Sequence, residues 1–155
     1  MDEAADANSL VAAYAAFIRR YDWDWWCHLT FAKAPPLDRA LRTLGAWMNG
    51  LNKKTFGNGY AKRGQGVRWV RGTECQKTGA YHFHLLLAGC QEIHTDVGVK
   101  SWLKLAGDAK IQVYDQTGGA PTYIAKVYGD SGALAFGGPW PPLDLSEISQ
   151  LNAMR

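Results

Sequence analysis

The chain has 155 residues, a formal net charge of +3 and an aromatic content of 12%. This length predicts one domain over residues 1–155, large enough to bury a core. No apolar run approaches the roughly 20 residues of a transmembrane helix, and the acidic N-terminus lacks the basic start of a signal peptide, so no membrane association is expected. Three cysteines without a CxxC pair favour a reducing cytoplasm over a disulfide framework or a zinc knuckle.

Hydrophobic periodicity predicts alternating helices and strands. The periodic segments are, in chain order, a helix over Ser9–Arg20, a strand over Trp25–Phe31, a helix from Pro36 to about Leu51, strands over Val67–Cys75 and Tyr81–Ala88, a helix over Thr95–Leu105, a strand over Lys110–Tyr114 and a helix over Thr122–Tyr128. A basic, glycine-rich loop, Asn52–Gly66, precedes the second strand. Residues 131–155 form a Gly- and Pro-rich C-terminal extension, for which irregular structure and then one short helical turn are expected.

The segment from Trp25 to Tyr114 has the element order β-α-β-β-α-β. This order predicts an α+β, ferredoxin-like fold, with an antiparallel sheet and helices packed on one face. The first and third strands are central in that fold, and the third strand here is Tyr81–Ala88. Because side chains alternate along a strand, Phe83 is expected to face the helices, while the opposite face stays open to a ligand.

A polar turn at residues 77–79 joins the second and third strands and predicts a β-hairpin, with Gly79 in the left-handed conformation. Pairing across this turn places Glu74 opposite His82, about 5 Å apart at Cβ. His84 shares their face because it lies two residues from His82. Two imidazoles and one carboxylate can form an open metal site that leaves positions for water or substrate. The alternative is a hairpin with two surface histidines paired with the glutamate.

Tyr123 and Lys126 form a second constellation on the last predicted helix. Their spacing of three residues places both side chains on one helical face. A neutral tyrosine is a poor nucleophile because its unperturbed pKa is about 10, so a nearby metal ion or lysine would have to favour the phenolate. The alternative is an ordinary helix with Tyr123 packed and Lys126 solvated. The sequence identifies no partner for His28 or His94, so core or surface roles are expected for both.

Taken together, these motifs resemble those of the HUH endonuclease superfamily. His82-Phe83-His84, followed by an apolar run, is similar to its His-hydrophobic-His motif, and the Tyr-X-X-Lys spacing of Tyr123 and Lys126 resembles its nucleophile motif. The strand residues 28–31, His-Leu-Thr-Phe, are similar to the apolar-Leu-Thr-aromatic strand of the replication-initiator branch. The resemblance covers roughly residues 25–128, and the order of strand, Glu, His-X-His and tyrosine helix also matches that branch.

The resemblance implies a metal-dependent endonuclease and strand transferase. Such an enzyme nicks and rejoins single-stranded DNA at a specific site through a 5′-phosphotyrosine, and so initiates and terminates rolling-circle replication. Tyr123 would be the nucleophile, and Lys126 would lie near the scissile phosphate. His82, His84 and Glu74 would hold a divalent cation, Mn²⁺ or Mg²⁺.

The implied substrate, single-stranded DNA or a hairpin replication origin, would be bound by the basic middle of the chain. From Arg39 to Arg71 there are eight Lys and Arg residues and no acidic residue. Such a block predicts either a polyanion-binding face or a solvated helix and loop surface. The candidates for contacts with DNA phosphates are Lys53, Lys54, Lys62, Arg63, Arg68 and Arg71.

Bacteriophage-type members of the superfamily have a second tyrosine four residues after the first. Val127 occupies this position, and Tyr128 lies about 100° further round the helix, so a single-tyrosine enzyme is expected. No Gly-X-X-X-X-Gly-Lys-Ser/Thr stretch is present, so a helicase partner would act in trans or belong to another domain. The expected location is the cytoplasm, or the host compartment in which the replicon is copied.

Three other interpretations predict different chemistry. A His-X-His metal-dependent hydrolase of the histidine-triad type would need a third histidine, but Leu86 stands there. A cupin-like metal enzyme would need a glutamate soon after the histidines, where the chain has residues 85–90, Leu-Leu-Leu-Ala-Gly-Cys. A non-catalytic nucleic-acid-binding module on the same fold would bind DNA or RNA without a metal.

Overall fold

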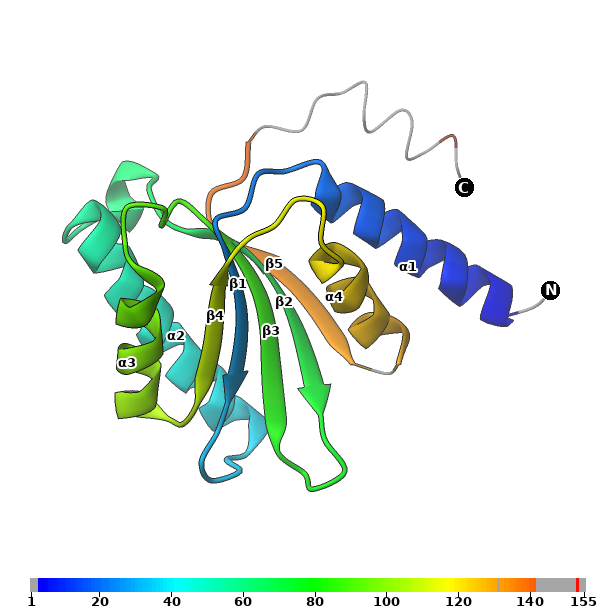
Figure 1. Cartoon of the computed structure of the whole chain (residues 1–155), viewed down its shortest axis with the longest axis horizontal. Coiled ribbons are helices and arrows are strands. Elements are labelled where there is room, and N and C mark those ends of the chain that lie inside the picture. The colour runs from blue at the N-terminus through cyan, green and yellow to red at the C-terminus, as the bar shows by residue number, and fades with distance from the viewer. Residues whose placement is uncertain (1–2, 131, 142–152, 154–155) are drawn as a thin grey trace.

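The computed structural model describes residues 3–130, 132–141 and 153 of the chain. In this part, five strands form one antiparallel sheet in the order β4-β1-β3-β2-β5, so β3 is the central strand (Figure 1). The elements are α1 (Glu3–Arg19), β1 (Trp25–Thr30), α2 (Leu37–Phe56), a 3₁₀ turn (Ala61–Arg63), β2 (Arg68–Cys75), β3 (Tyr81–Ala88), α3 (Thr95–Leu105), β4 (Ala109–Val113), α4 (Ala120–Gly129) and β5 (Ala133–Gly137). The predicted α+β class with an antiparallel sheet is confirmed.

Helix α2 continues through Phe56, so it includes the first residues of the segment expected to be a loop. Leu51 and Asn52 are buried at this point, and Asn52 accepts a hydrogen bond from the backbone N–H of Val67 at 2.7 Å. The helix ends at Gly57, whose positive φ of 82° an L side chain rarely adopts. Tertiary burial of the last turns therefore extends the helix beyond the point where the sequence becomes basic and polar.

Strand β5 was not predicted, because a Gly- and Pro-rich segment favours irregular structure. It pairs antiparallel with β2, with Arg71 opposite Ala135. A Cβ at Gly137 would collide with the indole ring of Trp69, so the glycine is what allows this ring to lie across the strand. The expectation of irregular structure is therefore wrong for residues 133–137. The short helical turn expected beyond residue 141 lies outside the described residues.

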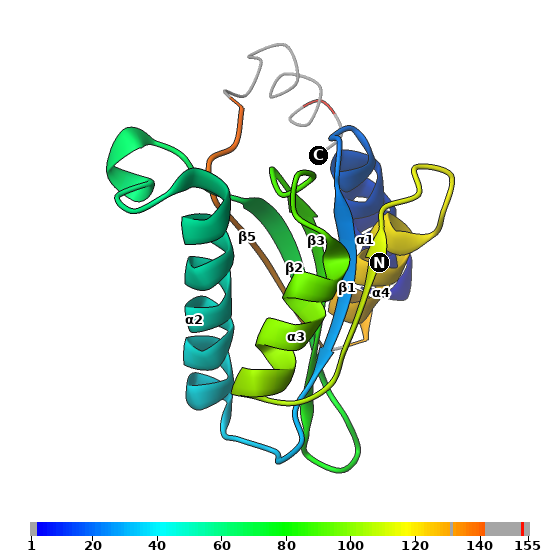
Figure 2. The same cartoon turned by 60° about the vertical axis from the view of Figure 1, so that its left-hand side comes forward.

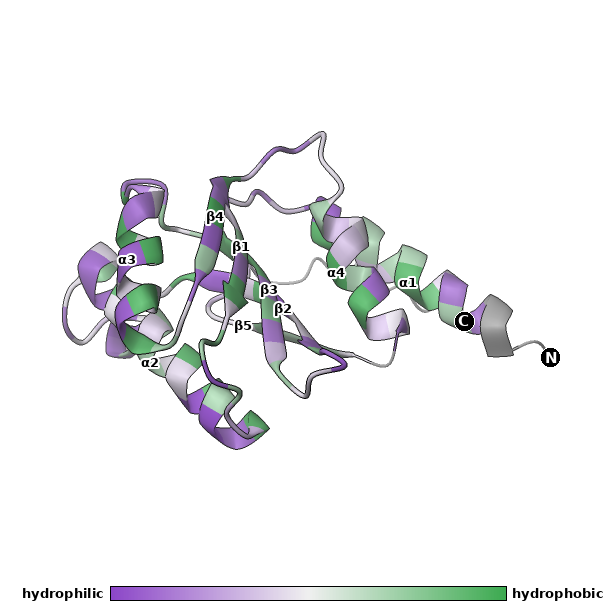
Figure 3. Cartoon of the chain, turned by 60° about the horizontal axis from the view of Figure 1, so that its bottom comes forward, coloured by the Kyte–Doolittle hydropathy of each residue, from purple (hydrophilic) through white to green (hydrophobic). Residues whose placement is uncertain are grey.

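Helices cover both faces of the sheet, which corrects the expectation that they pack on one face (Figures 1 and 2). Helices α2 and α3 pack on the face of Phe83, where the largest buried side chains are those of Trp25, Trp47 and Trp102. On the other face, Ile124 of α4 packs with residues from α1, β2 and β3 in a second cluster that includes Ile18, Val70 and Leu86. Figure 3 shows hydrophilic and hydrophobic residues along the helices of both layers, as expected for helices with one buried side.

Helix α4 packs closely on β2 because Gly72 has no side chain. A Cβ at Gly72 would lie 3.4 Å from Val127. The helix lies over β2 and β5, and α1 packs beside it (Figure 1). The β1–β4 part of this face is more open, and the side chains of Lys110 and Gln112 are exposed there. Among the described residues, no helix is long and apolar enough to cross a membrane.

The close contact between α3 and the sheet predicts that adding one methyl group at Gly98 lowers stability. A Cβ at Gly98 would lie 2.7 Å from Ile111 and 2.8 Å from the ring of Trp25, so Gly98→Ala should lower the free energy of unfolding by about 1–3 kcal/mol. Gly45→Ala in α2 is the matched control. No atom lies within 4 Å of its added Cβ, so it should be neutral or stabilise by up to about 1 kcal/mol. Urea denaturation measures both, and a Gly98→Ala variant as stable as the wild type would contradict this packing.

Candidate active site

The β2–β3 hairpin has the predicted register. The backbone N–H of Gln76 donates to the carbonyl of Ala80 at 2.8 Å, and Gly79 has the positive φ of 83° that the turn requires. Glu74 and His82 are directly opposed Cα partners. The carboxylate and the two imidazoles therefore lie on one face of the sheet, as predicted.

The glutamate contacts His84 rather than the histidine opposite it. Oε2 of Glu74 lies 2.9 Å from Nε2 of His84, whereas Nδ1 of His82 lies 3.2 Å from the amide nitrogen of Gln76. A diagonal pair of this kind is within reach of a long side chain across neighbouring strands. His84 is only 4% exposed, so the half-exposed carboxylate of Glu74 is the polar group that meets its Nε2.

His28 contacts His84, although sequence analysis assigned it no partner. It lies on β1 directly opposite His84, and the two Nδ1 atoms are 2.9 Å apart. The structure therefore supplies the partner that the sequence did not identify for His28. Alternation along β1 already places His28 on the face opposite the buried Cys27 and Leu29, but its neighbour depends on the register of β1 against β3. His94, in contrast, is exposed and caps α3 by accepting a hydrogen bond from the N–H of Asp96 at 3.2 Å.

Burial keeps the two central imidazoles neutral. Desolvation lowers the pKa of His28 to about 4, helped by the nearby charges of His84, Lys110 and His82. Desolvation also lowers the pKa of His84, although the hydrogen bond and the charge of Glu74 act in the opposite direction. Neutral imidazole is the form that ligates metal ions.

Tyr123 reaches the histidines from α4. Its ring centroid is 4.9 Å from that of His84, 6.1 Å from that of His28 and 6.0 Å from that of Trp26. The side chain is 46% exposed, so the phenol is accessible to a ligand. The tertiary structure therefore brings the Tyr-X-X-Lys helix to the His-X-His strand.

A cleft of about 400 Å³ lies between α4 and the end of β2. Both proposed catalytic residues, Tyr123 and Lys126, line it together with the carboxylate of Glu74. Lys126 is exposed, so its ammonium group is available to an anion in the cleft. The remaining lining residues are Cys75, Val127, Asp130 and Gly132.

Most of the predicted DNA-binding residues lie far from this cleft. Lys53 and Lys54 are exposed in the last turn of α2, and Lys62 is exposed in the 3₁₀ turn. This loop precedes Arg68, which is six residues from Glu74 along β2, or about 20 Å in an extended strand. These lysines and Arg68 therefore lie towards the opposite end of β2 from the imidazoles.

The three arginines among the predicted DNA-binding residues contact the protein itself. Arg63 donates to the carbonyl oxygens of Phe56 and Asn58, at 2.6 and 2.8 Å. Arg68 donates to the carbonyl of Asp22 at 2.6 Å, and its guanidinium lies over the rings of three aromatic residues. These residues are Tyr21, Trp23 and Trp140.

Arg71 lies on the opposite face of β2 from Glu74, because the two are an odd number of residues apart. Its guanidinium is 5.4 Å from the ring of Trp69 and 5.8 Å from that of Phe83, and its Nε has no hydrogen-bond partner among the described residues. The cations that share the face of the imidazoles are instead Lys126 and Lys110, the β4 residue opposite His28. Only the first of these was expected from the sequence.

The donor set suits a divalent cation, but its side chains do not surround one point. No three His, Cys, Asp or Glu side chains of the described residues form a group that could hold a metal ion. His82 is the reason, because its ring is 6.5 Å from that of His84 and its Nδ1 meets Gln76. Imidazole nitrogen and carboxylate oxygen are nevertheless ligands that Mn²⁺ accepts, and all of them project from one face. The residues therefore fit a metal by their chemistry, provided that the half-buried side chain of His82 turns away from Gln76.

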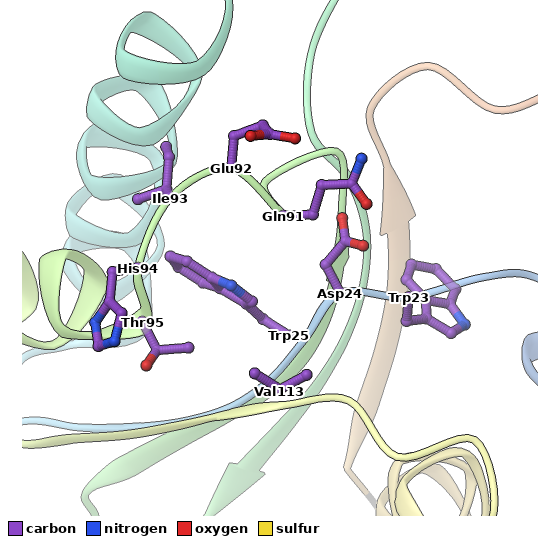
Figure 4. A pocket seen from close by; sticks show the side chains of 9 residues that line it. All are labelled: Trp23, Asp24, Trp25, Gln91, Glu92, Ile93, His94, Thr95 and Val113. Atoms are coloured by element: carbon purple, nitrogen blue, oxygen red, sulfur yellow. The ribbon is translucent and has the colours of Figure 1, made fainter.

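A second hollow, of about 500 Å³, lies at the other end of β1 (Figure 4). Its lining includes Trp25 on the floor, His94 and Thr95 at the start of α3, and Val113 on β4. Asp24 accepts a hydrogen bond from the N–H of Cys90 at 3.1 Å there, which braces the loop after β3. It shares no lining residue with the cleft beside Tyr123.

No family model matches the chain, and comparisons with curated proteins and with solved structures also found no match. The function of the site therefore has to be inferred from its own side chains.

Stability should depend on pH through His28. Its pKa is about 4 in the folded chain against 6.5 for an unperturbed histidine, so the unfolded chain binds the proton more tightly between these values. The free energy of unfolding should therefore fall as the pH is lowered from 6.5 towards 4, and it should fall less in His28→Asn. Urea denaturation at several pH values measures the difference, with His94→Asn as the exposed control. Parallel pH profiles for the wild type and His28→Asn would contradict a half-buried imidazole that stays neutral.

Proposed function

We propose that the chain is a metal-dependent endonuclease that nicks and rejoins single-stranded DNA through a covalent tyrosine intermediate, as rolling-circle initiators of the HUH type do. The observation that supports this most directly is the contact between Tyr123 and His84, whose ring centroids are 4.9 Å apart. These residues are 39 positions apart in the sequence and lie on different elements. Their contact is therefore produced by the tertiary fold and not by closeness along the chain. An exposed phenol beside an imidazole–carboxylate pair is an arrangement suited to nucleophilic attack.

The topology agrees with this proposal. Strands β1 to β4 lie in the order β4-β1-β3-β2, and their connecting helices α2 and α3 share one face. We assign this part to the ferredoxin-like arrangement, with β5 added beyond β2 and α4 packed on the opposite face. In this assignment the His-X-His residues are on the central strand, whose pairing on both sides holds them rigidly.

We assign His82, His84 and Glu74 to a divalent cation, Mn²⁺ or Mg²⁺. When bound, the cation would supply Lewis-acid polarisation of the scissile phosphate. Low pKa values keep the central imidazoles unprotonated near neutral pH, so no proton has to be removed from an imidazolium before His84 binds metal. The carboxylate adds the negative charge that a hard cation prefers.

Tyr123 is the proposed nucleophile. Its phenolic oxygen attacks the phosphorus in line, forming the Tyr–O–P bond and breaking the P–O3′ bond. The phenol loses its proton to solvent, and the departing 3′ oxygen gains one, which leaves a free 3′-hydroxyl and a 5′-phosphotyrosine. Lys126 lines the same cleft, where its ammonium group would stabilise the phenolate and the phosphate charge. Because the phosphodiester energy is kept in the covalent bond, the reverse reaction rejoins a strand without ATP.

The surroundings of α4 support a single nucleophile. Val127 is buried and would lie close to a Cβ at position 72, so the position four residues after Tyr123 faces the sheet. Tyr128 packs edge-on against Tyr14 of α1, with ring centroids 5.4 Å apart. It therefore lies on the side of α4 that faces α1, away from the imidazoles.

The distribution of basic residues supports two zones of DNA contact. Lys126 and Lys110 flank the site, where they would neutralise phosphates of the strand being cut. The exposed lysines of the α2–β2 segment precede Arg68, which is about 20 Å from Glu74 along β2, the length of about six base pairs of duplex. A hairpin origin, with its single-stranded cleavage site next to a duplex stem, would engage both zones. Opening of further duplex would require a helicase partner.

Replacing the nucleophile should separate chemistry from binding. With Mn²⁺ and labelled single-stranded oligonucleotides, the wild type should form a protein–DNA adduct that survives denaturation and is lost on addition of chelator. Tyr123→Phe should form no adduct, because it lacks the attacking oxygen, but it should bind the same DNA within a few-fold of wild-type affinity. Tyr128→Phe is the matched control on the same helix, and it should keep the adduct.

Two results would contradict this proposal. An adduct that maps to Tyr128 in the wild type would overturn the choice of nucleophile. No adduct across origin-derived hairpins, with DNA binding that is independent of metal, would indicate a non-catalytic nucleic-acid-binding module instead.

Removing one proposed ligand should weaken metal binding and cleavage together. His82→Ala should lower Mn²⁺ affinity by at least about tenfold and reduce adduct formation in parallel, since the imidazole is partly exposed and its loss should cost little stability. The control is His94→Ala, at an exposed histidine remote from the cleft. Isothermal calorimetry and the adduct assay measure the two effects, and unchanged cleavage by His82→Ala would exclude His82 as a ligand.

A further inference from the structure

We propose that His28 is a positioning residue for the metal site, which holds His84 in the tautomer that can bind a cation through Nε2. This inference rests on the proposed function, because it concerns the same site. No motif of the sequence assigns such a role to His28. Its basis is a chain of three side chains from three strands: His28 of β1, His84 of β3 and Glu74 of β2.

Both nitrogens of His84 have partners. Nε2 lies 2.9 Å from Oε2 of Glu74, and Nδ1 lies 2.9 Å from Nδ1 of His28. The nitrogen that faces the carboxylate is the one that would bind a cation together with Glu74. A neutral imidazole can bind through Nε2 only when its proton is on Nδ1, because a protonated ring nitrogen has no free lone pair.

The metal-binding tautomer of His84 therefore needs a hydrogen-bond acceptor at Nδ1. His28 supplies one when its own proton is on Nε2. Water is a poor substitute at this position, because His84 is only 4% exposed and its Nδ1 is already occupied by the second ring. A buried N–H without an acceptor is unfavourable, and its cost would directly weaken cation binding at the other nitrogen.

Without a cation, the same hydrogen bond runs in the opposite direction. His84 then donates from Nε2 to the carboxylate of Glu74, and His28 donates from Nδ1 to Nδ1 of His84. Cation binding moves the His84 proton from Nε2 to Nδ1 and the His28 proton from Nδ1 to Nε2, so each ring keeps one proton. Glu74 and His28 are both partly exposed, so solvent can carry these protons.

Packing keeps His28 in place for this role. Its ring lies edge-on to Trp26, with centroids 4.5 Å apart, and edge-on to His84 at 5.0 Å. β1 is hydrogen-bonded on both sides, to β3 and β4, so the backbone of His28 is fixed. Such support for the second nitrogen of a metal-binding histidine is worth 10- to 100-fold in metal affinity in other proteins, and a similar loss is expected here (about 10–100-fold).

The test compares two substitutions of His28. The amide of Asn can place an acceptor near the position of Nδ1, whereas Leu has a similar volume and no acceptor. Mn²⁺ affinity measured by calorimetry should fall about 10–100-fold in His28→Leu and stay within a few-fold of wild type in His28→Asn. His94→Leu, at an exposed histidine, should leave the affinity unchanged. Equal affinity of His28→Leu and the wild type would overturn the proposal.

Two measurements have readouts that do not depend on cleavage. Long-range ¹H–¹⁵N spectra of the wild type should place the His84 proton on Nε2 without metal and on Nδ1 with Mg²⁺ or Zn²⁺; a proton that stays on Nε2 would overturn the proposal without any variant. Pulsed electron paramagnetic resonance of bound Mn²⁺ counts imidazole ligands. The same count in wild type and His28→Asn supports a positioning role, whereas one ligand fewer would make His28 a ligand and overturn it.

Failure of the role proposed for His28 can be distinguished from failure of the proposed function. If the wild type binds Mn²⁺ and His28→Leu binds it equally well, only the role of His28 is wrong, and the adduct assay with Tyr123→Phe still tests the nuclease. If the wild type binds no divalent cation at all, the metal-dependent nuclease and the role of His28 are both wrong.

Discussion

The site depends on the alternation of side chains along the central strand β3. Phe83, Leu85 and Leu87 are buried against α2 and α3, so His82 and His84 must lie on the other face. A register shift of one residue would exchange these two sets and place imidazoles in the apolar core. Burial of three large apolar side chains therefore fixes the face of the sheet on which the histidines lie. Pairing of β3 with β1 and β2 then brings His28 and Glu74 to opposite sides of His84.

The position of α4 is the second constraint. Gly72 lets the helix approach β2, Ile124 is fully buried in the cluster between helix and sheet, and α1 packs beside the helix. With that side of the helix buried, Tyr123 is directed along the sheet surface towards His84. The same packing buries Val127, so the helix presents one accessible phenol to the imidazoles. The packing that stabilises the second cluster therefore also positions the proposed nucleophile.

Charge is divided between the two ends of the sheet. The imidazole end contains the neutral rings of His28 and His84, the carboxylates of Glu74 and Asp130, and the nearby ammonium groups of Lys126 and Lys110. The other end contains the exposed lysines, together with Arg63, which braces the loop, and Arg68, which packs on the aromatic cluster. This division keeps the exposed lysines of the loop away from the proposed metal ligands, where they would compete with a cation.

The sequence by itself determined the α+β class, nearly all of the helices and strands, the hairpin register and the common face of Glu74, His82 and His84. Each of these follows from local periodicity or from a turn only a few residues long. The tertiary structure alone decided that α4 covers the second face, that β5 extends the sheet, that Arg71 faces away from the site and that His28 meets His84. These features depend on contacts between segments far apart in the chain, whose energies come from packing and strand pairing. No local pattern of residues encodes which distant strand or helix supplies the matching surface.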